Sequence, residues 1–298
     1  MISCILAFYI AAHAPAAALG LAPVIPSPTD VAAQDDDPDA LYAKREDLAS
    51  ARRAVAAWQN RMSRDARDFE SAWKLARGRY WLAGHAPAAE AKQILEDGIA
   101  AAKTAAALRP ERPEGHFWMA ANMGALAESF GMRQGLKYRG AIKDALLTVL
   151  KLDPAFQQGS ADRALGRWYY KVPGLFGGSN KKSEEHLRKS LTYAPQSTAS
   201  HFFLAETLFD LDRGDEARAE LKRVLDAPIE PDWGPEDREF KAKASQRLGR
   251  QDPKVQDPNP KALPTPKGQL NGQTPNQPAP WTWGWGLEVG SPLALGSW

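Results

Sequence analysis

Apolar residues recur at steps of three and four along much of the chain, the spacing that places them on one face of a helix. The clearest case follows Gly214, where Ala217, Leu221, Val224 and Leu225 share one face. Asp215 is the predicted N-cap of that helix. Alanine is abundant and β-branched residues are sparse, which also favours helices.

Two further helices follow from the same reasoning. One carries Leu187 and Leu191 on its apolar face and begins at Ser179 or Asn180, either of which can cap it. The other runs over 235–248 and opens with Pro-Glu-Asp, an acidic first turn that suits the helix dipole. We expect this last helix to pack over the open end of the helical array as a terminal cap.

An internal repeat organises these helices. Four of them are predicted to stop just before a proline, which cannot continue the helix behind it but fits the first turn of the next. The steps between successive prolines are 44, 41 and 33 residues, and a tetratricopeptide helix pair takes about 34. The four prolines are Pro110, Pro154, Pro195 and Pro228.

The starts of the units also recur. Gly115-His116-Phe117-Trp118 resembles Ser200-His201-Phe202-Phe203, and the segment 164–170 fills the same role between them. Small residues such as Gly166 allow two helices to approach closely, while nearby aromatic side chains fill the space beside the contact. The predicted fold is therefore all-α: a tetratricopeptide-like helical-repeat solenoid with a C-terminal capping helix.

Composition divides the chain into four segments. Residues 1–22 are apolar and small and are predicted to be a signal peptide, although no basic residue precedes Lys44. A membrane anchor is the alternative for this segment, but His13 and Pro15 interrupt the span. Residues 23–38 are a predicted flexible spacer, 39–248 the helical-repeat domain, and 249–298 a disordered tail rich in proline and tryptophan. The tail is either an extension without a role or a docking peptide.

The charge and the motifs of the sequence argue against nucleic-acid binding and against catalysis. The formal net charge is +2, which gives no electrostatic reason to expect a nucleic acid as partner. The single cysteine, Cys4, excludes a cysteine-based metal site and an internal disulfide. The spacing of a phosphate-binding loop is absent around Gly177-Gly178, and no histidine pair has metal-ligand spacing. We therefore expect no catalytic residues, no metal and no cofactor: the chain is not an enzyme.

The segment from about 113 to 244 resembles the T-component proteins of tripartite ATP-independent periplasmic (TRAP) transporters. The stretches that carry this resemblance are 115–118, 165–170, 201–206, 217–221 and, most specifically, Pro173-Gly-Leu-Phe-Gly-Gly-Ser179. The resemblance implies a periplasmic tetratricopeptide protein that pairs with the transporter's substrate-binding subunit. It also implies a trimer and an apolar ligand in a channel through the array. Without a convincing lipid-attachment cysteine, we do not expect a lipoprotein.

A second resemblance is to the eukaryotic regulators of microtubule dynamics. Their tetratricopeptide-like core has a segment similar to Gly166-Arg-Trp-Tyr-Tyr170. The predicted signal peptide argues against this second interpretation.

Consecutive aromatic residues indicate where a partner binds. A helix turns by 100° per residue, so the run Trp168-Tyr169-Tyr170 cannot all face one side. At least one member should face a groove or a partner. The predicted binding residues are Arg167, Trp168, Tyr170, Phe176, His116 and His201, although the two histidines occupy equivalent repeat positions where packing or capping also explains them. The predicted function is an exported binding protein, a TRAP-type helper, with a structural scaffold of the cell envelope as the alternative.

Overall fold

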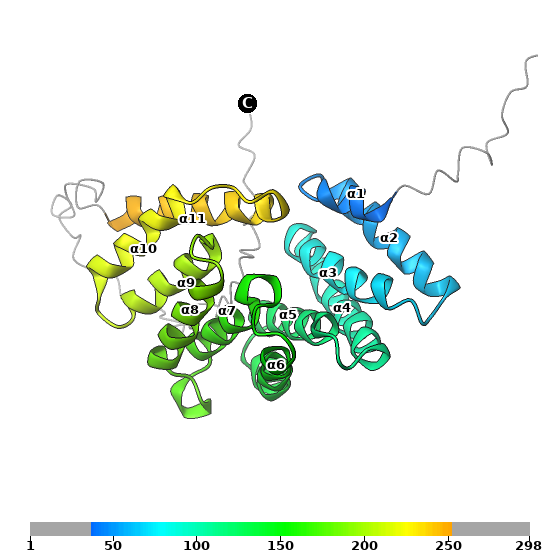
Figure 1. Cartoon of the computed structure of the whole chain (residues 1–298), viewed down its shortest axis with the longest axis horizontal. Coiled ribbons are helices and arrows are strands. Elements are labelled where there is room, and N and C mark those ends of the chain that lie inside the picture. Colours follow the sequence, from blue (N-terminus) through cyan, green and yellow to red (C-terminus); the bar gives the residue numbers. More distant parts are fainter. Residues whose placement is uncertain (1–36, 252–298) are drawn as a thin grey trace, which may run out of the picture. The chain divides into compact units, whose positions relative to one another are not determined.

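The computed structural model describes residues 37–251, so the predicted leader, nearly all of the spacer and nearly all of the tail lie outside the described residues. Every regular element within 37–251 is a helix, and successive α-helices lie antiparallel in an array (Figure 1). The elements are α1 (Pro38–Ala43), α2 (Leu48–Arg64), α3 (Phe69–His85), α4 (Ala88–Leu108), α5 (Pro113–Ser129), α6 (Met132–Leu152), α7 (Phe156–Lys171), η1 (Gly174–Phe176), α8 (Asn180–Tyr193), α9 (Thr198–Phe209), α10 (Gly214–Asp226), η2 (Pro231–Trp233) and α11 (Gly234–Gln251).

The proline repeat marks the ends of helix pairs. The second helix of each of the pairs α3–α4, α5–α6, α7–α8 and α9–α10 ends two residues before one of the four predicted prolines. The first helices pack against one another in order, α3 on α5, α5 on α7 and α7 on α9; we call these four the inner helices. The predicted tetratricopeptide-like helical repeat is thereby confirmed.

Capping differs between the two helices for which we predicted it. The Ser179 side chain accepts a hydrogen bond from the Lys182 amide at 3.3 Å and so caps α8 as expected. The prediction for α10 is wrong: Arg213 holds the cap position without a side-chain cap bond, and Asp215 lies within the first turn. The Arg213 guanidinium instead bonds Glu216 and Glu184, which ties this corner to α8.

Close packing between the helices of a pair depends on small residues. A Cβ added at Gly166 of α7 would lie 2.5 Å from Leu187 Cγ of α8, so no larger residue fits there without moving α8. Buried apolar side chains form one cluster from α1 to α7 and a second from α8 to α11. Phe240 of α11 belongs to the second cluster, packed against Phe202 and Phe203 of α9.

The helix α11 does more than cover the last pair. It begins beside α1 and runs across the array to α10, so its first turns meet the opposite end of the domain (Figure 1). Arg238 of α11 bonds Glu46 at 2.9 Å, and Glu239 contacts His85 at the end of α3 at 2.7 Å. The capping helix is therefore confirmed, and it also joins the two ends of the array.

None of the helices within residues 37–251 has the length and apolarity needed to cross a bilayer.

Candidate functional site

Two adjoining cavities lie between the inner helices and the segment η2–α11. The first, of about 360 Å³, is enclosed by α7, the start of α9 and α11; the second, of about 530 Å³, extends toward α1 and α3. Gln158, Trp233 and Glu236 line both, so the two form one continuous site. Its size is that of pockets that bind small ligands or a few residues of a peptide.

A left-handed turn at the start of α7 builds one wall. Gln157, Gln158 and Gly159 have φ values of 44°, 61° and 71°, a conformation that L-residues rarely adopt. It costs about 1–2 kcal/mol for each of the two glutamines. The turn places both glutamine side chains on the cavity wall, and Gly159 lies so close to α8 that a Cβ would meet the Tyr193 ring at 2.8 Å.

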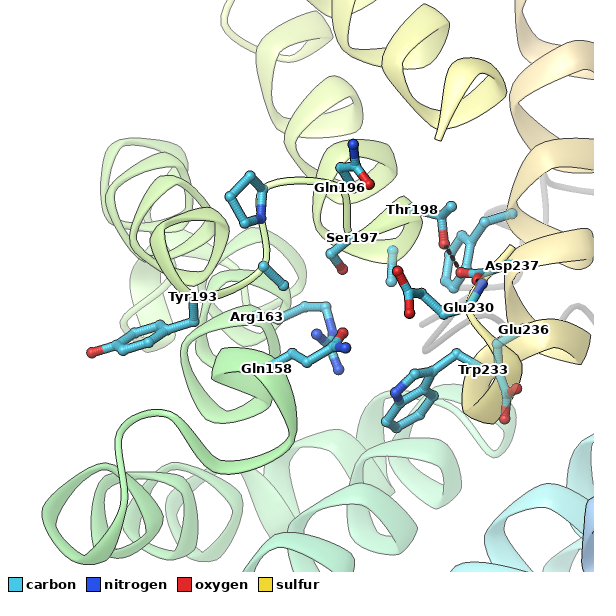
Figure 2. A pocket seen from close by; sticks show the side chains of 14 residues that line it. Gln158, Arg163, Tyr193, Gln196, Ser197, Thr198, Glu230, Trp233, Glu236 and Asp237 are labelled. Carbon is cyan, nitrogen blue, oxygen red and sulfur yellow. Dashed lines mark hydrogen bonds between the residues drawn. The ribbon is translucent and has the colours of Figure 1, made fainter. Parts of the chain in front are cut away.

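The opposite wall comes from η2 and α11. Asp237 accepts hydrogen bonds from Thr198 Oγ1 at 2.6 Å and from the Glu230 amide at 2.9 Å, which fixes the start of α11 against α9 (Figure 2). Burial raises the pKa of the neighbouring Glu236, although an ion pair of 2.6 Å with Arg45 opposes this. The indole of Trp233 points from η2 into the space between these walls (Figure 2).

Arg163 of α7 faces the same space, and it lines the cavity together with Gln158 (Figure 2). Burial lowers its pKa to about 10, and the attraction of Tyr80, Asp237 and Glu236 does not make up for this loss of solvation. The side chain is nevertheless charged at neutral pH. It retains some accessible surface because it lines the cavity.

The cavity offers charge and hydrogen bonding rather than a nucleophile. Its described lining contains neither histidine nor cysteine. Its threonine and serine hydroxyls make hydrogen bonds: Thr198 donates to Asp237, and Ser197 caps α9 by accepting from Ser200 N. The tyrosines Tyr42 and Tyr193 also belong to the lining. Among residues 37–251 no group of three histidine or acidic side chains is arranged to hold a metal ion. The arrangement suits non-covalent binding.

Four of the predicted binding residues lie around the end of α7, away from this cavity. Arg167 is buried and pairs with Glu206 of α9 at 2.6 Å, while its guanidinium lies over the rings of Tyr170 and Phe203. Tyr170 is half-buried, and burial is the main reason why its pKa is raised. Trp168 is buried and donates its indole N–H to the Arg139 carbonyl at 3.0 Å. The half-buried Phe176 lies beneath the guanidinium of that same arginine.

The two predicted histidines occupy equivalent places, as the repeat implies. The Nε2 of His116 contacts the Pro110 carbonyl at 3.0 Å, and the Nε2 of His201 contacts the Pro195 carbonyl at 2.8 Å, six residues upstream in each case. His201 is buried and also bonds Glu220 at 2.6 Å. Neither histidine lines the cavity. A binding role for these six residues stays a prediction.

Sequence reasoning missed the cavity residues for a physical reason. Arg163, Glu230 and Trp233 are isolated in sequence, and they meet only because α11 returns across the array. Only the left-handed turn left a trace in the sequence, as a Gly after two glutamines, and such a signal is weak on its own.

The fold defines a class: this is a tetratricopeptide-like helical-repeat protein, with a cavity between its inner helices and α11. A family model described as "Regulator of microtubule dynamics protein 1-3" matches residues 36–176, just under half of the chain. Membership of the TRAP T-component family, predicted from sequence, is not shown. No curated protein matches the chain in sequence.

A solved structure with a TM-score above 0.5 shares the fold, and two others are similar below that level. A thermophilic TPR protein from Thermus thermophilus is 19% identical, with a TM-score of 0.54, and the match covers 72% of this chain and 98% of that one. Two crystal structures of MamA have a TM-score of 0.42 at 18% and 17% identity, covering 67% and 69% of this chain and 95% and 92% of theirs. At these identities the likeness concerns the fold alone.

Proposed function

We propose that this protein is a non-enzymatic binding scaffold that holds a segment of a partner protein in the cavity between its inner helices and α11. The single observation that carries the proposal is the cavity itself. It is continuous from α1 to α11, is lined by charged and aromatic side chains, and contains an arginine without a hydrogen-bond or ion-pair partner among the described residues. Helical repeats of this kind commonly bind extended or helical partners on such a face.

The finer function predicted from sequence remains part of this proposal. In it, the protein is an exported helper of a TRAP-type transporter and its partner is the substrate-binding subunit. The support is the resemblance of the α7–α8 turn, Pro173-Gly-Leu-Phe-Gly-Gly-Ser179, together with a binding cavity in a helical-repeat domain. The charged lining favours a polar segment over the apolar ligand that the resemblance implies.

Site-directed photo-crosslinking in the full-length protein tests the scaffold. A photoreactive amino acid replaces Ala199, which lines the cavity, or Ala219, which is exposed on α10 and outside it. After irradiation in cells, we expect position 199 to give crosslinks that map to one contiguous segment of one protein. Position 219 should give none to that segment.

Two further variants sharpen the result. Arg163→Gln should reduce the crosslinks at position 199, because a carboxylate of the partner loses its charged contact. Tyr170→Ala, in the predicted site outside the cavity, should leave them unchanged. Equal crosslinking at 199 and 219, or loss only with Tyr170→Ala, would place the binding surface elsewhere and overturn the proposal.

A further inference from the structure

Arg163, which is partly buried, differs from the two fully buried arginines of the described chain. Arg45 and Arg167 each form an ion pair of 2.6 Å with a glutamate. Arg163 has no hydrogen bond or ion pair with any residue of 37–251, and burial lowers its pKa. An enclosed guanidinium without a partner is costly, and a bound anion would remove that cost.

Two of the three acidic side chains that line the cavity beside Arg163 are already in use. Asp237 holds Thr198 and the Glu230 amide, and Glu236 holds Arg45. Neither can move to Arg163 without giving up those bonds. Glu230, the third carboxylate of the lining, reaches in from the opposite side and makes no ion pair with Arg163. Arg163 is therefore open to an anion from outside the domain, and its planar guanidinium, which can offer two parallel N–H donors, fits a carboxylate.

The charge on the facing wall limits what this anion can be. Glu230, Glu236 and Asp237 all line the cavity around Arg163. These carboxylates repel a phosphate dianion about twice as strongly as a single carboxylate, whose one charge Arg163 can match. A singly charged group is thus favoured over a phosphoryl group.

Glu230 supplies the second half of the site. Its carboxylate reaches into the cavity from the side opposite Arg163, and within the described chain it has no hydrogen bond or ion pair (Figure 2). A protonated nitrogen is the natural partner for it. Trp233, from the same turn, presents an aromatic ring that attracts a cation placed over its face.

We infer that the cavity takes a ligand carrying a carboxylate and a protonated nitrogen, with the carboxylate on Arg163 and the nitrogen on Glu230. Both a free amino acid and a peptide segment with neighbouring acidic and basic side chains have this chemistry. The inference rests on the proposed function in that both use the same cavity. The inference specifies the charges of the ligand, whereas the proposed scaffold function specifies only where on the domain the partner binds.

Calorimetric titration of the full-length protein with matched probes tests this pairing. The free-amino-acid series is leucine with both charges, N-acetyl-leucine with only the carboxylate, and leucine amide with only the ammonium. The peptide series is a terminally blocked aspartyl-lysine dipeptide and its asparaginyl-lysine and aspartyl-norleucine counterparts. In at least one series we expect the doubly charged probe to bind roughly 10- to 100-fold more tightly than either singly charged one. The series that shows this identifies the source.

Two variants assign the charges. In Arg163→Gln the carboxylate of the probe should no longer increase its affinity, while the ammonium still should. In Glu230→Gln the ammonium should no longer increase the affinity, while the carboxylate still should. Neither side chain bonds another described residue, so neither variant should lower the melting temperature of the free protein, and this controls for misfolding. Ala219→Gln on α10 is the matched surface control.

Equal affinity for singly and doubly charged probes would overturn the inference. So would unchanged selectivity in both variants, or no binding of any probe. If no probe binds while position 199 still crosslinks to a partner segment, the proposed scaffold function is supported and only the proposed charge pairing is wrong. If the probes bind as expected and position 199 captures no protein, the site is a small-molecule site and the scaffold function falls.

Discussion

Arg45, two residues after the end of α1, donates a hydrogen bond of 2.6 Å to Glu236 of α11, across 191 positions of sequence. The same guanidinium donates to the Asp232 carbonyl at 2.9 Å and lies over the ring of Trp81. The Trp81 indole in turn donates to the Arg45 carbonyl at 3.0 Å. One buried arginine thus connects the end of α1, α3 and the start of α11 beside the cavity.

Replacing Arg45 tests how much this connection stabilises the domain. Because Arg45 is 5% exposed and Glu236 25%, Arg45→Met leaves a carboxylate partly buried without its cation. We expect a loss of about 3 kcal/mol in the free energy of unfolding, measured by urea denaturation. The matched control is Arg238→Met, whose pair with Glu46 is half exposed and screened by water, so its loss should change the free energy of unfolding little. Similar losses in the two variants would contradict a special role for Arg45.

The contact between His85 and Glu239 should depend on pH. Burial lowers the pKa of His85, but its hydrogen bonds to the Glu239 carboxylate and the Trp81 carbonyl outweigh that effect, so the net pKa is raised. The carbonyl can only accept, so Nδ1 carries a proton, and the carboxylate favours a second proton on Nε2.

A raised histidine pKa stabilises the fold fully below the unfolded value of about 6.5, and the stabilisation is lost as pH rises through the folded pKa. We therefore expect faster amide exchange, after correction for its intrinsic pH dependence, in the first turns of α11 as the pH rises from about 6 to about 8. The variant His85→Gln should show no such change between these pH values. A pH response that persists in this variant would assign the effect to another group.

The two equivalent histidines should differ in their contribution to stability. His201 is buried between the Pro195 carbonyl and the Glu220 carboxylate, and His201→Ala removes both contacts and leaves Glu220 with Arg223 as its remaining partner. We expect a loss of about 2–3 kcal/mol in thermal or chemical unfolding. His116, at the same repeat position, makes the single Pro110 contact at a more exposed site, and His116→Ala should cost about 1 kcal/mol or less.

Such a result would mark His201 as a structural residue. If His201→Ala folds with wild-type stability and instead weakens partner binding, the binding role predicted from sequence is the correct one.

The left-handed turn at the cavity wall should store strain. At Gln158, with φ of 61°, a glycine avoids the clash of the Cβ atom but is more flexible in the unfolded chain. We expect Gln158→Gly to raise the free energy of unfolding by up to about 1 kcal/mol, with the melting temperature as readout. Gln158→Ala keeps the Cβ, removes the same amide and should give no gain. A loss of stability in the glycine variant would show that the conformation is not strained.

Prediction from sequence succeeded where the determinants are local. The prolines at 110, 154, 195 and 228 fix the ends of four helices through chain geometry alone, and Ser179 caps the helix that it precedes. The failed cap at Asp215 has a tertiary cause, since Arg213 at the cap position is held by Glu184 of another helix.

The cavity could not be predicted from local sequence patterns. Arg163 and Glu230 lie 67 positions apart in sequence, and neither belongs to a motif. Their juxtaposition depends on the path of α11, which is set by Phe240 packing on α9 and by the contacts of Arg45 and His85. No periodicity in the sequence encodes the far end of that path.

The return of α11 to α1 also bears on how the domain comes apart. Stacked repeats ordinarily touch only their neighbours, so their outermost helices fray first and unfolding spreads inward. Here α11 is held by Arg45 and Glu46, in the turn that follows α1, so loss of α11 also removes contacts at the other end of the domain. The closure has an entropic cost that grows only slowly with the length of chain it spans, about 0.6 kcal/mol for each doubling. The closure couples the unfolding of the two ends of the domain. Because α11 forms one wall of the cavity, release of α11 would open the cavity and begin to unfold the outer helices at the same time.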